Sequence, residues 1–533
     1  NKILKISDNG IGMTEDEVVK YITQIAFSGA EDFIEKYKDK TDAKDGIIGH
    51  FGLGFYSAFM VSSSVEIETL SYQQEAQPVH WKSDGSNVYE ITDGTRTTHG
   101  TDIILNISDE ETEFLEKTRI SEILKKYCKF MPYEIFFTVK GEEKDTEDKE
   151  EKCVNITSPL WLKAPKDCTK EQYEEFYRDT FLDFNPPLFW IHLNVDYPFN
   201  LKGILYFPKQ SNNLEVMPGE IKLFSNQVYI ADNIKEVVPE FLMLLKGVID
   251  CPDLPLNVSR SFLQNDGDLI KISRHITKKV SDKLHSIFNN DRKEYESYWD
   301  DISPFIKFGC IKDEKFYDRV KDIILFKTIN NEYLTLQEFP KQDDNKIFYV
   351  TDEDVQAQYI NMFKENNINA AILNHAIDQH FISFIEYKDS TVKFLRIDSD
   401  ISANLKKADA DEKNDELIEK FKNSVSNKDI TVKAEHLKSE NTPAIIILSE
   451  HERRLQEMSA MYAGMFPNTK PSITIVLNLE NEVIKSINSL DDEKCKLVCE
   501  NIYDLATISN RQLTKDEMKD FINRSVEILK MVK

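Results

Sequence analysis

The segments Asp8-Asn9-Gly10-Ile11-Gly12-Met13 and Gly49-His50-Phe51-Gly52-Leu53-Gly54 decide how this chain is interpreted. The first places a carboxylate on a glycine turn just after the strand-like run Ile3-Leu4-Lys5-Ile6. The second leads into an apolar helical pattern over residues 55–61. Glycines let backbone N–H groups approach phosphate oxygens, and a helix N-terminus favours negative charge. Together the two segments predict a nucleotide pocket, with an acid that recognises the base and a loop that holds phosphates.

The glycine-rich segment differs from two common phosphate-binding patterns. No Gly-Lys-Ser/Thr follows it, so it is not a Walker loop. The βαβ context and the ribose-binding acid of a dinucleotide fold are also missing. On this motif alone, a simple tight turn stays open as an alternative, and the polar residues 38–45 before it fit either a lid or a surface loop.

Composition narrows the class of protein. The 533 residues suggest several domains, and a formal charge of −26 opposes a nucleic-acid partner, which would need clustered Lys and Arg. Seven scattered cysteines indicate a reducing, cytoplasmic compartment, and Cys495 and Cys499 fit core thiols better than metal ligands. No apolar run is long enough to cross a membrane. The chain opens at Asn1, inside a predicted strand and without Met, so we expect an N-terminally truncated fragment.

Several local patterns predict secondary structure and boundaries. Thr14-Glu15-Asp16-Glu17 is a capping box that starts a helix with Val18 on its apolar face. Alternating runs at 65–69, 88–91 and 101–105 predict antiparallel strands. The wholly polar run 141–152 predicts a solvated linker.

Three further features suggest function. Arg260 follows a Pro-containing loop and precedes a helix, so it could reach a phosphate or form a structural ion pair. The aromatic stretch 295–309, with Trp299, predicts core or, in part, an exposed contact surface. Two amphipathic helices end the chain and predict self-association. Methionines of the helix that begins near Ser449 fit either a contact surface or a core; they are Met458, Met461 and Met465.

The order of these motifs resembles that of the ninety-kilodalton heat-shock chaperone family, in its bacterial HtpG type, within the GHKL ATPases. The resemblance rests on Asp8-x-Gly10-x-Gly12-Met13, residues 48–57 and Gly100-Thr101, and continues through Pro159-Leu-Trp161, residues 255–264 and Asn441-Thr-Pro-Ala444. It spans nearly the whole chain and implies an α/β (α+β) multidomain fold. The implied parts are a truncated GHKL-type ATP-binding α/β sandwich (1–139), a charged linker (140–155), an α/β middle domain (156–405) and a mixed C-terminal dimerisation domain with a terminal helix pair (406–533).

The resemblance also implies roles for individual residues. Asp8 would accept a hydrogen bond from the adenine amino group, Gly12 and Thr101 would complete the base site through ordered water, and Met13 would pack on the base. The residues that would wrap the phosphates of ATP are Gly49, Gly52, Leu53, Gly54 and Phe55. Arg260 would reach the γ-phosphate with support from Gln264, and Mg²⁺ would accompany the nucleotide.

Two departures from the family pattern bear on activity. The family's general-base glutamate and Mg²⁺-holding asparagine lie upstream of the strand that contains Asp8, so this chain is assigned neither residue and no metal ligand. Phe27 stands where the family commonly has a lysine. We expect an ATP-dependent chaperone that clamps non-native proteins as a homodimer through its C-terminal helices, with client contacts at the methionines and Trp299. This fragment should bind ATP better than it hydrolyses it.

Two other functions stay open on the sequence. A mismatch-repair or topoisomerase-type DNA enzyme belongs to the same ATPase superfamily, although the charge of −26 opposes it. A non-catalytic dimeric holdase or scaffold would need no general base.

Overall fold

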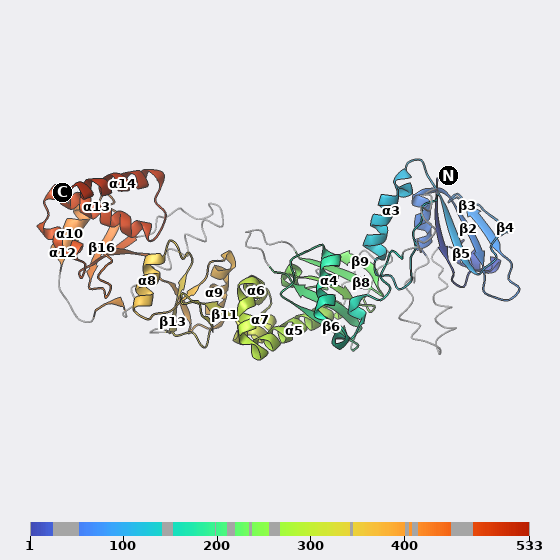
Figure 1. The fold of residues 1–533 in the computed structure, drawn as a ribbon, viewed down its shortest axis with the longest axis horizontal. Coiled ribbons are helices and arrows are strands. Elements are labelled where there is room, and N and C mark those ends of the chain that lie inside the picture. Colours follow the sequence, from blue (N-terminus) through green and yellow to red (C-terminus); the bar gives the residue numbers. More distant parts are fainter. Residues whose placement is uncertain are drawn as a thin grey trace. The chain divides into compact units, whose positions relative to one another are not determined.

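A computed structural model describes most of the chain, which forms two compact units, residues 1–283 and 284–533 (Figure 1). Each unit is described by itself. The described residues are 2–24, 53–140, 153–197, 199–209, 219–233, 237–254, 267–341, 345–399, 405–407, 414–448 and 473–531.

The first unit begins with a five-stranded antiparallel sheet in the order β1-β5-β2-β3-β4. Its strands confirm the runs predicted at 3–6, 65–69, 88–91 and 101–105. One face is apolar, and the capping box at Thr14 and Glu17 starts the helix α1 (Glu15–Tyr21), whose Val18 is fully buried against that face. The strands are β1 (Ile3–Asp8), β2 (Ser62–Leu70), β3 (Val79–Ser83), β4 (Tyr89–Asp93) and β5 (Gly100–Ile107).

The apolar helix predicted over residues 55–61 is a 3-10 helix, Gly54–Met60. The Phe55 ring meets the Trp81 ring edge-to-face, with centroids 5.9 Å apart. This contact anchors the 3-10 helix on the apolar face of the first sheet.

A second sheet in the same unit has the order β6-β7-β10-β8-β9, and only its β8–β10 pair is parallel. It packs an apolar core rich in aromatic rings against α4 (Lys170–Phe181), a helix capped by Thr169. The helices α3 (Lys117–Ile123) and α5 (Gly267–Asn290) flank it in sequence. Its strands are β6 (Phe189–Val195), β7 (Leu201–Phe207), β8 (Glu220–Ser225), β9 (Val228–Asp232) and β10 (Lys246–Asp250).

The second unit starts with helices and a three-stranded parallel sheet, β14-β13-β15. Trp299 lies in α6 (Arg292–Lys312) with 2% of its surface exposed and its ring 5.9 Å from that of Tyr295. The expectation of a client surface at Trp299 is therefore wrong, because the indole is already covered by the core. The other elements are α7 (Glu314–Val320), β11 (Leu325–Lys327), β12 (Tyr333–Thr335), β13 (Lys346–Val350), α8 (Ala357–Glu365), β14 (Ala370–Ile372), α9 (Ala376–Lys388) and β15 (Lys393–Arg396).

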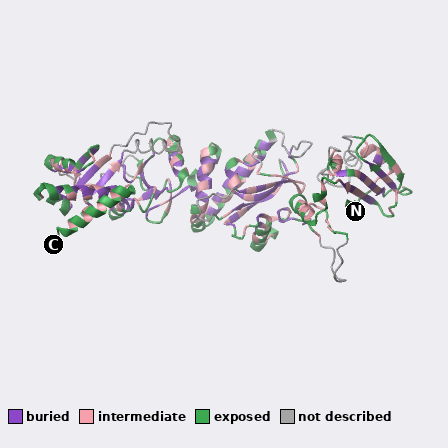
Figure 2. Cartoon of the chain, turned by 90° about the horizontal axis from the view of Figure 1, so that it is seen from above, coloured by how far each residue is buried: buried purple, intermediate pink, exposed green. Residues whose placement is uncertain are grey.

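The second unit ends in a sheet of order β16-β18-β17 and the two predicted amphipathic helices, α13 (Asp492–Ile508) and α14 (Lys515–Lys530). Cys495 and Cys499 are buried on α13, as expected of core thiols. Figure 2 shows buried residues gathered on the strands, whereas α14 buries none of its residues. The remaining elements are α10 (Asp415–Ser424), β16 (Ile430–Glu435), β17 (Ala444–Leu448), β18 (Ile473–Asn478) and α12 (Glu482–Ser486).

Some predictions fall on residues outside the described ranges: the polar run 141–152, the lid-like residues 38–45, and Gly49, Gly52, Arg260, Gln264, Met458, Met461 and Met465. The proposed domain boundaries stay a prediction. In the part of the chain that is described, no helix is both long and apolar enough to span a bilayer.

Candidate nucleotide-binding site

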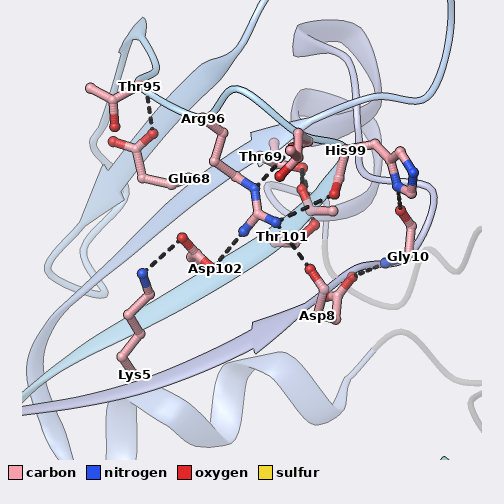
Figure 3. Close-up of polar contacts among 12 residues, drawn as sticks. Lys5, Asp8, Gly10, Glu68, Thr69, Thr95, Arg96, His99, Thr101 and Asp102 are labelled. Atoms are coloured by element: carbon pink, nitrogen blue, oxygen red, sulfur yellow. Dashed lines mark hydrogen bonds and ion pairs between the residues drawn. The ribbon is translucent and has the colours of Figure 1, made fainter.

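The first sheet brings Asp8 and Thr101 together at one end (Figure 3). Gly12 and Met13 lie beside them in the turn after β1, where Gly12 approaches Leu70 and Gly100 and Met13 bonds to Thr69. Asp8 is the last residue of β1, and its carboxylate is exposed. One oxygen, Oδ1, accepts the backbone N–H of Gly10 at 2.8 Å, which fixes the carboxylate on the turn. The other oxygen, Oδ2, has no hydrogen bond from any residue within the described ranges and can accept one from a ligand.

Two glycines at this end are required by the backbone itself. Gly12 has φ +63°, and a Cβ there would lie 1.8 Å from the carbonyl oxygen of Leu70. Gly100 has φ +122°, and its Cβ would lie 2.2 Å from the carbonyl oxygen of Asp8. A larger residue at position 12 would push the turn away from β2, and one at position 100 would push β5 away from β1. The two glycines therefore set how closely these segments approach one another.

A hydroxyl pair lies beside the carboxylate. Asp8 is the register partner of Thr101, which in turn is the partner of Thr69, so the three side chains share one face of the sheet. Thr69 Oγ1 accepts the N–H of Met13 at 3.0 Å and donates to the carbonyl oxygen of Gly100 at 3.1 Å.

The number of protons then fixes the direction of the bond between the two hydroxyls. Thr69 Oγ1 and Thr101 Oγ1 are 3.0 Å apart, and Thr69 has already given its single proton to Gly100. Thr101 must therefore donate to Thr69, which leaves the lone pairs of Thr101 as acceptors. Asp8 and Thr101 together present acceptors to whatever occupies this face.

Arg96, on the opposite face of the sheet, and His99, just before β5, support the turn, and neither was predicted from the sequence. Arg96 donates to the carbonyl oxygen of Asp8 at 3.2 Å and pairs with Asp102 at 2.5 Å. His99 Nδ1 is 2.7 Å from the carbonyl oxygen of Gly10, and because a carbonyl only accepts, Nδ1 carries the proton. Burial alone would raise the pKa of Asp102, but the ammonium of Lys5 at 2.9 Å and the Arg96 guanidinium hold it below its ordinary value.

Of the five predicted phosphate-binding residues, Leu53, Gly54 and Phe55 lie within the described ranges. They form the entry to the 3-10 helix, and Tyr56 in that helix donates to the carbonyl oxygen of Ile22, past the end of α1, at 2.8 Å. Phe55 is half-buried in the sheet core, so its side chain has a packing role in addition to any contact that its backbone makes.

The arrangement can recognise a planar heterocycle that carries an exocyclic amino group. A carboxylate oxygen and a hydroxyl lone pair both accept, and the half-buried thioether of Met13 supplies an adjacent apolar surface. Adenine has these properties, so the residues present fit ATP. Among the described residues, no group of three or more His, Cys, Asp or Glu side chains is placed to hold a metal ion.

Comparison with known proteins agrees with this chemistry. Residues 1–102 match the family of histidine kinase-, DNA gyrase B- and HSP90-like ATPases, and residues 142–532 match the Hsp90 protein family. The chain is 43% identical to a Bacteroides thetaiotaomicron protein named chaperone protein HtpG, over 97% of this chain and 79% of that protein. Proteins of the same name from Bacteroides fragilis and Idiomarina loihiensis are 44% and 30% identical, over 92% and 97% of this chain and 75% and 86% of theirs.

Proposed function

Because this chain belongs to the Hsp90 family and is an ATP-dependent chaperone with an ATPase domain, we propose that it works as a dimeric, ATP-driven clamp on non-native proteins. The observation that supports the nucleotide site best is the pair of neighbouring acceptors, Asp8 and Thr101, at one end of the first sheet. This pair matches the amino edge of adenine and would repel a base that presents a carbonyl oxygen there.

Each residue of the proposed nucleotide site has a distinct role. Asp8 Oδ2 accepts from the adenine amino group, while Gly10 holds Oδ1. Thr101 and the backbone at Gly12 orient an ordered water against the base, and Met13 packs on its ring. The backbone of Gly49, Gly52, Leu53, Gly54 and Phe55 wraps the phosphates.

Hydrolysis in this proposal depends on charge stabilisation from a second part of the first unit. Arg260 approaches the γ-phosphate and stabilises the charge that develops in the transition state, with Gln264 as its support. Mg²⁺ would neutralise phosphate charge when it is bound, and the proposal assigns it no ligand within this chain.

We further propose that the terminal helices join two copies of the chain. α14 exposes an apolar stripe of Met518, Ile522, Val526 and Leu529, with exposed fractions of 40%, 53%, 47% and 69%. These residues are spaced by four, four and three, so they share one helical face. A water-exposed apolar face of this length on a terminal helix supports a helix-bundle interface with the same helix of a second copy.

Client contact and location complete the proposal. Met458, Met461 and Met465 are proposed to contact non-native proteins, since methionine side chains adapt to varied apolar surfaces. A cytoplasmic location is proposed because all seven cysteines are free thiols, none of them paired in a disulfide.

Competition between nucleotides tests the adenine assignment directly. Calorimetry on the whole chain should show binding of ATP and of ADP, and GTP binding weaker by about 100-fold, because the guanine carbonyl would face two acceptors. Equal affinity for ATP and GTP would contradict the assignment.

A second experiment distinguishes an ATP-driven chaperone from a holdase that needs no ATP. The aggregation of a denatured client protein is followed with and without ATP. Equal protection against aggregation in both conditions would favour the holdase.

A further inference from the structure

The strand β10 ends in a buried carboxylate that no part of the nucleotide site explains. Asp250, the last residue of β10, is 4% exposed. Its Oδ2 accepts the indole N–H of Trp161 at 3.2 Å and the backbone N–H of Gln227 at 3.0 Å, and its Oδ1 has no hydrogen-bond partner among the described residues. Burial raises the pKa of this carboxyl group above its ordinary value. A buried acceptor that binds two separate segments is an unusual feature in an apolar core rich in aromatic rings.

Trp161, the first of the two donors, is held by packing of its ring and by a hydrogen bond to its carbonyl oxygen. Trp161 is 1% exposed, and its ring centroid lies 4.6 Å from that of Phe130. Its carbonyl oxygen accepts from His192 Nε2 at 3.3 Å, while His192 Nδ1 accepts from the hydroxyl of Tyr173 at 2.6 Å. Burial lowers the pKa of His192, so the ring is neutral at neutral pH and can be donor on one side and acceptor on the other. Trp161 therefore reaches Asp250 from a fixed position.

The second donor lies on a turn that needs support. Asn226 and Gln227 connect β8 to β9 with φ values of 50° and 64°, a left-handed conformation that residues other than glycine seldom adopt twice in succession. The bond from Gln227 N–H to Asp250 lies at this turn. β8 also pairs directly with β10, so the carboxylate holds the turn and the strand end in one register.

Hydrogen bonds hold the first residues after Asp250. Cys251 donates its N–H to the carbonyl oxygen of Phe224 at 3.0 Å, and Asp253 accepts the N–H of Asn200 at 2.7 Å. Leu254 is the last described residue before the segment 255–266, which contains Arg260. The contacts of Asp250 therefore lie at the root of the segment that carries the proposed catalytic arginine.

We propose that Asp250 is a positioning residue for ATP hydrolysis, which holds Trp161 and the β8–β9 turn and thereby fixes where the chain leaves β10 toward Arg260. The inference rests on the role proposed above for Arg260. Its importance follows from the steepness of catalysis with geometry, since a misplacement of ~1 Å can lower a rate by ~10²-fold. ATP binding should not depend on Asp250, because the adenine site is built from other strands.

Three variants of the whole chain test this role. Trp161→Phe keeps the ring and removes one donor, and Asp250→Ala removes the acceptor for both donors. Asp250→Asn should keep the ATP hydrolysis rate of the parent, because both donors bond to Oδ2 and the amide oxygen of asparagine can take the place of that atom. Tyr177→Phe is the matched control: it removes a 2.7 Å bond to Asp183 in the same aromatic core, beside Lys246 at the other end of β10.

The expected result is a fall in kcat for ATP of about 10-fold in Trp161→Phe and more in Asp250→Ala, with KM changed less than about twofold. Hydrogen exchange of the backbone amides at 226–228 and 251–254 should accelerate in both variants, and Asp250→Asn and Tyr177→Phe should match the parent. Unchanged exchange in those two segments, or an equal effect of Tyr177→Phe, would overturn the inference. Arg260→Ala separates the two proposals: if it leaves kcat unchanged the arginine's role fails, whereas exchange still decides the role of Asp250.

Discussion

Replacing Asp8 by asparagine isolates a single atom of the nucleotide site. Oδ1 of Asp8 is engaged by the Gly10 N–H at 2.8 Å, and a side-chain amide must turn its oxygen to this donor. The NH₂ group then takes the place of Oδ2 and points a donor at the amino group of adenine. The substitution thus removes one charge-assisted hydrogen bond, worth about 1.5–3 kcal/mol, and leaves two donors facing each other, for a total loss of at least about 3 kcal/mol.

This loss corresponds to a rise in the Kd for ATP of more than about 100-fold. Fold stability should change by less than about 0.5 kcal/mol, because the Asp8 side chain is exposed and its bond to Gly10 survives. Isothermal titration calorimetry measures the Kd, and thermal denaturation measures stability. Asp16→Asn, on the exposed first turn of α1, is the matched control and should bind ATP as the parent does. Unchanged ATP affinity in Asp8→Asn would refute the adenine assignment.

Three further predictions concern the backbone, the terminal helices and the core. Gly12→Ala should lower the melting temperature in calorimetry, because alanine in the left-handed conformation costs about 1–2 kcal/mol and its Cβ would also clash with the Leu70 carbonyl. Gly54→Ala is the control and should leave the melting temperature unchanged, because its Cβ would meet no atom within 4 Å. Ile522→Glu should shift the mass in light scattering from dimer toward monomer; a persistent dimer would place the interface elsewhere. Lys307→Met should lower the free energy of unfolding of the second unit by about 3–5 kcal/mol in denaturant unfolding, because the carboxylate of Asp378, with a 1% exposed side chain, loses the ammonium group 2.5 Å away. A decrease of less than about 1 kcal/mol would contradict the role of this buried ion pair.

Local sequence patterns predicted four strands of the first sheet, its capping box and its glycine turn, because each depends on residues close in the chain; β3 was not predicted. The capping box at Thr14 needs only a glutamate three residues later, and alternation in 101–105 shows which side chains share a face. The positive φ of Gly12 likewise follows from a local turn.

The same reasoning could not find Thr69, Arg96 or His99, because their roles come from strand pairing. Thr69 meets Thr101 across a register that joins residues 32 positions apart, and alternation specifies a face without naming the partner strand. The prediction of a contact surface at Trp299 was wrong for a related reason. A cluster of aromatic residues has the same composition in a core and on a sticky surface, and only packing distinguishes them.

The two faces of β5 explain why the nucleotide site cannot be understood from its contact residues alone. Thr101 and Asp102 are consecutive, so the strand directs the first to the face that carries Asp8 and Thr69 and the second to the opposite face. Arg96 joins the two faces, because one guanidinium pairs with Asp102 and also donates to the backbone carbonyl of Asp8. The position of Asp8, the carboxylate proposed to bind adenine, thus depends on an ion pair on the other face of the sheet. Since the pKa of Asp102 is lowered in the folded state, this ion pair contributes its full stability above the ordinary carboxyl pKa, and the contribution is lost as the pH falls from there through the lowered pKa of the folded state. The support for Asp8 should therefore be constant across the neutral range, and any change of ATP affinity with pH there must arise from other groups.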